Sequence, residues 1–453
     1  MYPKEKILED LQIFFVQFDE VHPAPFKYIS WEKFTQELKI IKNTIGDSIS
    51  DLAFHNMLRP LFKQIGCGHT TALPPTSWYD FQKSKGLLLP FDVYIANQKC
   101  YVRNIFSQKM TLPKGTEVLT VNGNKTSIII DKMSTLQERD GYNESFQEKF
   151  VEKLFRTYYI FLYGNDSTYT LTYLDSLGME QVVVVPGATA HDMVTTKPVV
   201  KSTDDFQIKT TDATCTFFKA NPDVAYVDLN KFQSKKYKKF YSSVFSTIKE
   251  KEIKHLIIDV RGNGGGYFPN GNRLLRYLSN DLIEFSFYRP NKKIKNKKHL
   301  KMPFGSRMTK FVFSLIPDRD NDKTKRTVVI PYKPKKKNHF DGTITVLIDG
   351  GSFSMSSYVA SKLKHHTDAY FIGNETGGGQ EGSNAILQYT LSLPNTGVRV
   401  VLPYYVLDHK VTPEISGRGL RPDTFVTYTI EERLARKDKE LKLALELIEQ
   451  KSK

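Results

Sequence analysis

The stretch LIIDVRGNGGG (Leu256–Gly266) decides the fold class of the chain. Its first five residues are nearly all apolar, which is typical of a strand buried on both faces of a parallel sheet. A strand over 224–229 and a helix over 235–251 are predicted before it, and an apolar run at 343–348 with a helix from about residue 356 after it. This alternation of strands and helices predicts an α/β domain.

Two other regions precede this domain, which we place at 196–453. Residues 1–75 are predicted to form helices, because apolar residues recur at helical spacing and Ser30 is placed to cap the second helix. From Leu87 to Pro186 the apolar period changes to two, and Asn122-Gly123 marks a tight turn. We therefore predict a β-rich domain over 76–195, joined to the third by a connector within 187–212.

Composition narrows the class of protein. The chain has 453 residues, 40% hydrophobic and 25% charged, which suits a folded protein and excludes wholly disordered or coiled-coil chains. No run of 18 apolar residues occurs. Three cysteines are odd in number and lack paired metal spacing, which argues against a disulfide scaffold and against a zinc site. We expect no metal.

The net charge of +16 is concentrated in one segment. Residues 288–339 contain 17 Lys or Arg and 3 Asp, a net +14, which leaves only +2 for the rest of the chain. We interpret this segment as a basic surface insertion. No zinc-finger, RRM or KH signature accompanies it, so nucleic acid is not expected as a partner. Either it only raises solubility, or it draws an anionic partner such as an acidic substrate or an anionic envelope surface.

The first residues, MYPKEKILEDLQIFFVQFDE, do not form a signal peptide, because acids interrupt the apolar positions and no small-residue cleavage site follows. Two readings remain open. The protein is cytoplasmic, or the sequence begins after a signal that was removed.

Two turns carry candidate chemistry. In RGNGGG (Arg261–Gly266), glycines let backbone N–H groups point at a ligand, which suits an oxyanion hole; a phosphate loop or a plain tight turn is the alternative. The segment lacks the G-K-[ST] ending and the G-x-G-x-x-G spacing of nucleotide loops. In IDGGSFSMSSYVA (Ile348–Ala360), a serine at a strand-to-helix turn suits a nucleophile, although serines also cap helices.

Six motifs occur in a fixed order along nearly the whole chain: GHT at 68–70, GTEVLTVNG at 115–123, DVRGNGGG at 259–266, SFSMSS at 352–357, GNETGGG at 373–379 and GRGLRPD at 417–423. In order and type they resemble the motifs of the tail-specific, or C-terminal-processing, serine peptidases and of the tricorn core protease. The resemblance implies a multidomain α/β fold with a helical N-terminal cap, a PDZ-like β-domain and a crotonase-like (ClpP/crotonase) catalytic core.

The resemblance also implies roles for individual residues. Ser354 corresponds to the nucleophile and Met355 to the residue whose N–H helps to form the oxyanion hole, together with Gly264 or Gly265. The tail-specific branch uses a lysine as its base, and Gly379 stands at that position in this chain. The tricorn-like branch uses a histidine base from the first motif, and His69 occupies that position.

The chain departs from the tricorn-like branch at Gly68, where that branch has a serine before the histidine. No motif marks the supporting carboxylate of this branch, and we assign it to Glu414, shortly before the last motif. A histidine base of ordinary pKa predicts that activity rises through a pH near ~6.5.

By resemblance, the function is that of a serine-type peptidase that cleaves polypeptides without a metal or organic cofactor. The PDZ-like domain is expected to engage the substrate chain, and an exported or envelope-associated location is expected from relatives. Two other classes stay open. One is a non-catalytic binding module for apolar ligands on the same fold, and the other is an acyl-thioester enzyme of crotonase type.

Overall fold

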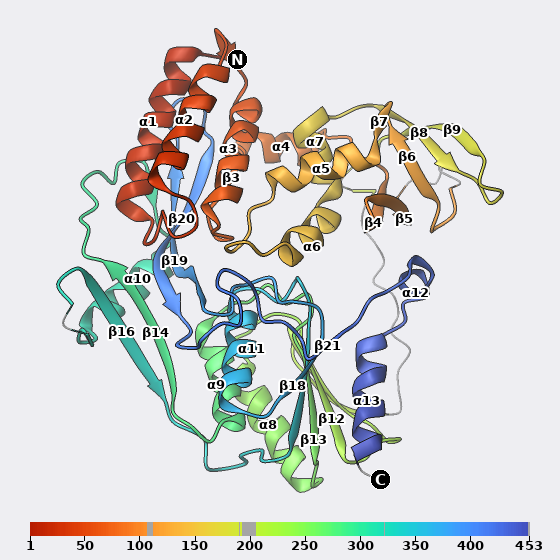
Figure 1. The fold of residues 1–453 in the computed structure, drawn as a ribbon, viewed down its shortest axis with the longest axis vertical. Helices are drawn as coiled ribbons and strands as arrows, with labels where there is room; N and C mark the ends of the chain where they lie inside the picture. The colour runs from red at the N-terminus through yellow and green to blue at the C-terminus, as the bar shows by residue number, and fades with distance from the viewer. Residues whose placement is uncertain (107–111, 190, 193–204, 321, 452–453) are drawn as a thin grey trace.

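The computed structural model describes residues 1–106, 112–189, 191–192, 205–320 and 322–451. Figure 1 shows the N-terminal helices and the β-rich unit beside one another at one end of the molecule, and a larger sheet flanked by helices at the other. The mixed α/β class predicted from the sequence is confirmed. The predicted boundary between residues 195 and 196 lies outside the described residues.

The N-terminal region consists of three helices that pack their apolar stripes together. Ser30 caps the second helix, as predicted, because its hydroxyl oxygen accepts the N–H of Lys33 at 3.1 Å. The third helix ends at Gly66, whose φ of +67° closes it in the left-handed region. The elements are β1 (Tyr2–Pro3), α1 (Lys4–Val21), α2 (Trp31–Thr44), β2 (Ser48–Ile49) and α3 (Asp51–Ile65).

The second unit is less purely β than the sequence indicates. Its strands are β4 (Phe91–Ala96), β5 (Lys99–Ile105), β6 (Glu117–Val121), β7 (Asn124–Lys125), β8 (Thr168–Leu174) and β9 (Glu180–Pro186), paired in the order β4-β5-β6-β8-β9 with β7 on β6. The Asn122-Gly123 turn is confirmed by positive φ angles at both residues. Its helices are α4 (Thr76–Ser84), α5 (Thr126–Leu136), α6 (Ser145–Lys153) and α7 (Phe155–Tyr163).

Helices α5 and α7 show why local composition misleads here. Their sequences, TSIIIDKMSTL and FRTYYIFLY, are rich in β-branched and aromatic residues that favour strands by propensity. Both helices bury those side chains in the same hydrophobic cluster as strands β4, β5, β6 and β8. Tertiary packing therefore overrides the local preference.

The third unit is built on a seven-stranded sheet in the order β10-β11-β12-β13-β17-β18-β21. From β12 onward all neighbours are parallel. The strands are β10 (Phe206–Lys209), β11 (Ala213–Phe217), β12 (Val224–Leu229), β13 (His255–Asp259), β17 (Thr343–Ile348), β18 (Tyr370–Gly373) and β21 (Thr424–Phe425). The flanking helices are α8 (Tyr237–Glu250), α9 (Phe268–Leu278), α11 (Met355–His366), α12 (Ile430–Leu434) and α13 (Lys439–Lys451).

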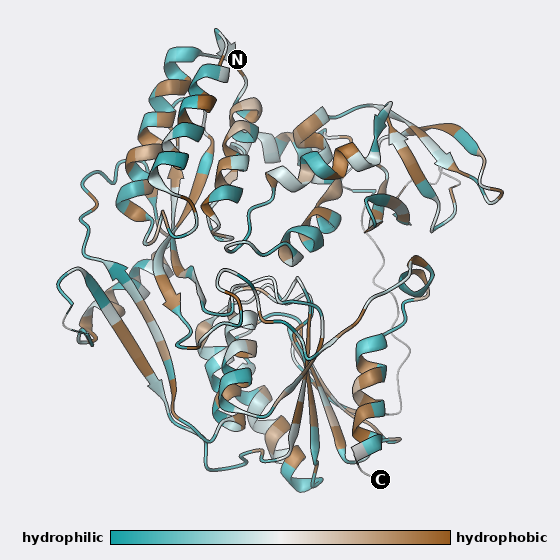
Figure 2. Ribbon diagram, viewed as in Figure 1, coloured by the Kyte–Doolittle hydropathy of each residue, from teal (hydrophilic) through white to brown (hydrophobic). Residues whose placement is uncertain are grey.

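Both faces of this sheet are covered. In Figure 2, brown hydrophobic stretches run along its central strands and along α13. Ile257 and Leu347 share a buried cluster with Ala444 of α13, whereas Ile258 and Val346 belong to the large cluster that includes α8, α9 and α11. A capping box formed by Thr429 and Glu432 begins α12.

The basic segment is an ordered part of a further sheet rather than a loose loop. Strand β14 pairs with β16 and with β20, and helix α10 lies between β14 and β16 in the chain. The sheet also ties the N-terminal helices to the core, because β3 pairs with β20. Its elements are β3 (Thr71–Leu73), β14 (Ile283–Pro290), β15 (Leu300–Lys301), α10 (Phe304–Leu315), β16 (Lys325–Tyr332), β19 (Gly382–Ser392) and β20 (Arg399–Asp408). Among the described residues, no helix is long and apolar enough to span a bilayer.

Candidate active site

Three of the glycine-rich and serine-rich motifs meet at one edge of the seven-stranded sheet. They follow β13, β17 and β18, which are parallel neighbours, so their carboxyl ends lie side by side. In open α/β sheets this edge is where ligands bind. The motifs that are far apart in sequence are therefore close in space because of the sheet order.

Ser354 is held in a strained conformation between β17 and α11. Its φ of +57° and ψ of −116° lie outside the regions that non-glycine residues usually adopt. Two hydrogen bonds fix the turn before Ser354. The hydroxyl of Ser352 donates to the carbonyl oxygen of Val260 at 2.8 Å, and the N–H of Phe353 donates to the carbonyl oxygen of Asn263 at 3.0 Å. Such a turn presents a serine side chain at the start of a helix.

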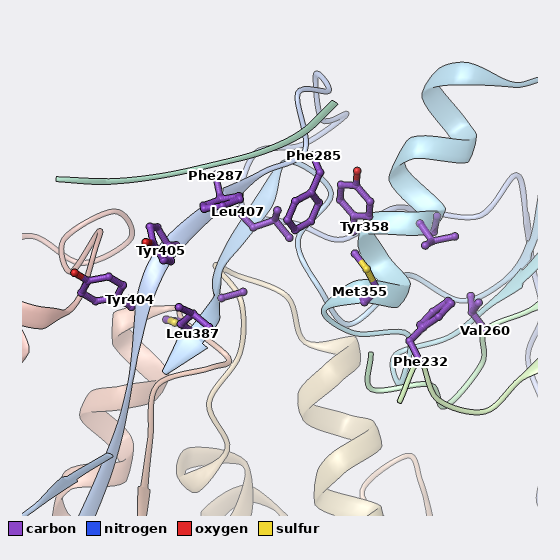
Figure 3. Close-up of a cluster of buried hydrophobic side chains, with 14 of the residues drawn as sticks. Phe232, Val260, Phe285, Phe287, Met355, Tyr358, Leu387, Tyr404, Tyr405 and Leu407 are labelled. Atoms are coloured by element: carbon purple, nitrogen blue, oxygen red, sulfur yellow. The ribbon is translucent and has the colours of Figure 1, made fainter. Parts of the chain in front are cut away.

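The side chain of Met355 anchors the first turn of α11. Figure 3 shows Met355 beside Tyr358 and Phe285 in a cluster of buried hydrophobic side chains. A Cβ atom at Gly271 would lie only 2.7 Å from the Met355 sulfur, so α9 and α11 pack at close range. The backbone N–H of Met355 is consequently fixed beside Ser354.

Gly265 lies against the backbone on both sides of Ser354. A Cβ atom at this position would be 2.8 Å from the Met355 nitrogen and 2.9 Å from the Ser354 Cβ, and its φ is +96°, so only glycine fits. The Gly265 N–H donates to the Asn263 side-chain oxygen at 2.9 Å. The Gly264 N–H, by contrast, has no hydrogen-bond partner among the described residues.

Asp349 joins two of the turns. Its Oδ1 accepts the backbone N–H of Gly262 at 2.7 Å and of Gly351 at 2.9 Å. Its Oδ2 lies 2.9 Å from Nζ of Lys149, which belongs to α6 of the second unit. The carboxylate therefore holds the turn after β13 against the turn after β17.

His69 reaches this site from the loop that follows α3. Its Nε2 lies 3.2 Å from the Ser354 hydroxyl oxygen. Its ring stacks on Phe353, with centroids 4.8 Å apart and planes 29° apart. Burial lowers the pKa of His69 to about 4, because desolvation disfavours the charged ring. The imidazole is therefore neutral at pH 7 and able to accept a proton.

The other ring nitrogen of His69 has no support in this structure. Nδ1 is buried and has no hydrogen-bond partner in the described part of the chain. The predicted supporting carboxylate, Glu414, is exposed. Its backbone N–H donates to the Gln380 side-chain oxygen at 3.1 Å, and its side chain forms no hydrogen bond with the described residues. The structure thus brings the other predicted site residues together (Ser354, His69, Gly264, Gly265 and Met355) and leaves Glu414 apart from them.

A buried hydrogen-bond chain shapes the loop that carries His69. The Ala24 N–H donates to Nδ1 of His22 at 3.3 Å, which leaves Nε2 to donate to the Thr70 hydroxyl at 3.0 Å. Thr70 in turn donates to the Cys67 sulfur at 3.1 Å. Burial lowers the pKa of His22 to about 3, so this chain is built on a neutral ring.

Asp140 is a site residue that the sequence did not reveal. Its buried carboxylate accepts the N–H of Gly68 at 2.8 Å and of Gly379 at 3.4 Å, so it bridges the histidine loop and the turn after β18. Burial raises the pKa of Asp140 to about 6. In the sequence, Asp140-Gly141 looks like an ordinary turn, and no spacing links it to the other motifs.

The position of Gly68 explains its departure from the serine of the tricorn-like pattern. A Cβ atom there would lie 2.8 Å from the tip of the Phe353 ring and 3.2 Å from Asp140 Oδ1. Phe353 and Asp140 therefore occupy the space that a serine side chain would need.

Comparisons with known proteins found one matching family model and several solved structures of similar fold. The family model for peptidase family S41 matches residues 223–426. The structure of mature CPAF complexed with lactacystin is similar with a TM-score of 0.66 and 14% identity, over 98% of both chains. The structure of mature CPAF alone is similar with a TM-score of 0.64 and 13% sequence identity, over 95% of this chain and 94% of that chain. At such identities the likeness concerns the fold. No curated protein sequence matches the chain. Among the described residues, no cluster of three or more His, Cys, Asp or Glu is placed to hold a metal ion.

Proposed function

We propose that the chain, whose residues 223–426 match the model of peptidase family S41, a family of serine peptidases, hydrolyses peptide bonds of polypeptides with Ser354 as nucleophile and His69 as general base. The observation that carries the proposal is the 3.2 Å separation between Ser354 Oγ and His69 Nε2. A serine hydroxyl is a weak nucleophile at neutral pH, so an adjacent base is required. The neutral ring of His69 supplies one.

In this mechanism His69 takes the Ser354 proton while Oγ attacks the scissile carbonyl carbon. The protonated ring then gives that proton to the leaving amine. In the second half of the reaction a water molecule attacks the acyl-enzyme while His69 takes a proton from that water, and His69 returns this proton to Ser354 Oγ as the new carboxyl group leaves. The strained Ser354 conformation supports this role, because such strain is stored at functional sites.

The negative charge on the substrate oxygen would be stabilised by backbone N–H groups. Met355 supplies one, since it is the first residue of α11 and its N–H lies at the positive end of the helix dipole. For the second donor the contacts favour Gly264 over Gly265, because the Gly265 N–H already donates to Asn263.

We assign Asp140 as a positioning residue. It does not contact Ser354, but it holds the N–H of Gly68, the residue before the base, and the N–H of Gly379. Because Nδ1 of His69 has no partner within the described ranges, the ring depends on the Phe353 stack and on this backbone tether. For Glu414 to support the ring, its exposed side chain would have to turn inward.

The unit that contains β4–β9 is proposed to be a PDZ-like domain that binds substrate. The unit built on the seven-stranded sheet is proposed to be a crotonase-like catalytic core. Strand β9 lies at the end of its sheet and carries exposed Val182 and Val184. An extended substrate tail would bind by adding a strand to such an edge. Val182→Glu with Val184→Glu should then raise KM for protein substrates and leave KM for a short peptide unchanged.

A fluorophosphonate that labels activated serines, followed by peptide mapping, tests the proposed nucleophile. Label is expected on the 352–357 peptide of the native chain and none on Ser354→Ala, with peptide hydrolysis lost in parallel. Ser356→Ala is the matched control, because the Ser356 hydroxyl is buried and has no hydrogen-bond partner in the part of the chain that the structure describes, so its loss leaves no polar group unpaired there. No label on the folded native chain would favour the non-catalytic binding module instead.

A further inference from the structure

Helix α10 carries an apolar stripe that faces away from the protein. Its members are between 49% and 76% exposed: Phe304, Met308, Phe311, Val312 and Leu315. At helical spacing these five side chains fall within an arc of about 100°. Monomeric proteins rarely expose an apolar patch of this kind unless it contacts a partner.

The opposite side of α10 fixes its orientation. Phe313 is buried and packs against Phe287 and Tyr405, with ring centroids 4.6 Å and 6.0 Å away. Figure 3 places Phe287 and Tyr405 in the hydrophobic cluster that continues to Met355 and Tyr358. The helix is therefore anchored to the catalytic core by one face while the stripe points outward.

The charge around this stripe has a single sign. Residues 291–317 contain eight Lys or Arg and no Asp or Glu. Lys297, Lys298 and Lys301, directly before α10, are exposed and form no ion pair with any described residue. Lys292, further from the helix, pairs with Asp19 of α1 at 3.0 Å. The stripe thus begins beside a group of unneutralised cations.

We propose that α10 and Lys297, Lys298 and Lys301 form a docking surface for an anionic phospholipid bilayer. The helix would lie in the plane of the interface, with the stripe among the acyl chains and the lysines against negative headgroups. This goes beyond the peptidase activity and does not depend on it. A bilayer meets both features at once, whereas an acidic polypeptide would neutralise the lysines and leave the convex stripe in water.

The docking surface would bring the candidate active site near the bilayer. Phe313 also contacts Phe268, the first residue of α9, with centroids 5.9 Å apart. Phe268 follows the Arg261–Gly266 turn by two positions. Substrates held at a membrane surface would then be the ones presented to Ser354.

Co-sedimentation of the full chain with vesicles tests the proposal. Binding is expected to phosphatidylcholine vesicles that contain about 30% phosphatidylserine, much less to pure phosphatidylcholine, and to weaken as salt screens the lysines. Phe311→Ser with Leu315→Ser should weaken binding at least ~10-fold by removing buried apolar area. Lys297→Ser, Lys298→Ser and Lys301→Ser together should abolish the preference for phosphatidylserine.

Two control variants separate this surface from general stickiness and charge. Lys333→Ser, Lys336→Ser and Lys337→Ser remove the same charge from the far end of the basic segment, and Val182→Ser with Val184→Ser remove exposed apolar area from β9. Both should bind vesicles like the native chain, and all variants should keep the native Tm because the changed residues are exposed.

Equal binding by the stripe variant and the native chain would overturn the proposal. The proposal would also be overturned if the native protein did not bind phosphatidylserine vesicles but did bind polyglutamate through Lys297, Lys298 and Lys301. That result would identify an acidic polypeptide as the partner.

Discussion

The ring of Phe353 lies between His69 and Phe146, with centroids 4.8 Å from the first and 4.4 Å from the second. The residue before the proposed nucleophile therefore also supports the proposed base. Phe146 belongs to α6 of the second unit, so the ring stack joins all three regions of the chain at the site. Because Nδ1 of His69 has no hydrogen-bond partner among the residues that the structure describes, the stack is a main constraint on the imidazole.

The first prediction concerns the close contact between Gly68 and Phe353. Gly68→Ser should lower kcat at least ~10-fold and the free energy of unfolding by about 1–3 kcal/mol, because the added atoms push the Phe353 ring off His69. Phe353→Ala opens that space, so the double variant should lose less than the two single variants predict together. The measurement is a double-mutant cycle on kcat and on urea unfolding.

A coupling of about 1 kcal/mol or more is expected from that cycle, since the two side chains would touch. Simple additivity would mean that Phe353 is not what excludes a serine at position 68.

The second prediction concerns the base. His69→Ala should lower kcat by at least ~10²-fold, in line with the loss of a general base. Activity requires the neutral ring, so the rise in kcat/KM that belongs to His69 should occur near its pKa of about 4 rather than near the ~6.5 that an unperturbed histidine predicts. A profile in which activity appears only above pH 8 would contradict a histidine base.

The third prediction concerns Asp140. Its carboxylate accepts two backbone N–H groups, and protonation removes part of that capacity, so kcat should fall as pH drops through its pKa of about 6. Asp140→Asn should lower kcat about 10-fold with little change in KM, because its amide group presents a donor to one of those N–H groups. The variant should also lose the step near pH 6 and keep the step near pH 4.

Glu414→Gln is the matched control for Asp140→Asn, because each substitution converts one carboxylate near the motifs into an amide. If Glu414→Gln lowers kcat and Asp140→Asn does not, the supporting carboxylate is Glu414 and it reaches His69 in the active form of the enzyme.

The sequence predicted the parts of the site that sit on recognisable turns. Ser354 and the Arg261–Gly266 turn follow apolar strands whose alternation with helices is visible in the sequence, and parallel pairing places them together. Asp140 was missed because its role depends on where the 138–143 segment meets Gly66 and Gly417, a long-range contact with no local pattern. The stripe on α10 was missed for a similar reason. Its spacing is readable, but only packing of Phe313 decides which side faces outward.

The last prediction follows from buried neutral histidines. Burial lowers the pKa of His22 and His55 to about 3 and of His409 to about 4, whereas the unfolded chain titrates near ~6.5. Between those values the unfolded chain binds more protons, so each ring contributes stability that is complete above pH ~6.5 and lost as pH falls toward the folded pKa. The free energy of unfolding, measured by urea titration, should therefore drop steeply below pH 6.

His409→Gln isolates one of these groups. The Nδ1 of His409 lies 2.8 Å from the Gln380 carbonyl oxygen, and a glutamine amide can donate there without titrating. The slope of unfolding free energy against pH between about 6 and 4 should be smaller in this variant by up to about 1.4 kcal/mol per pH unit, the share of one proton. Equal slopes in the variant and the native protein would mean that acid unfolding is governed by other groups.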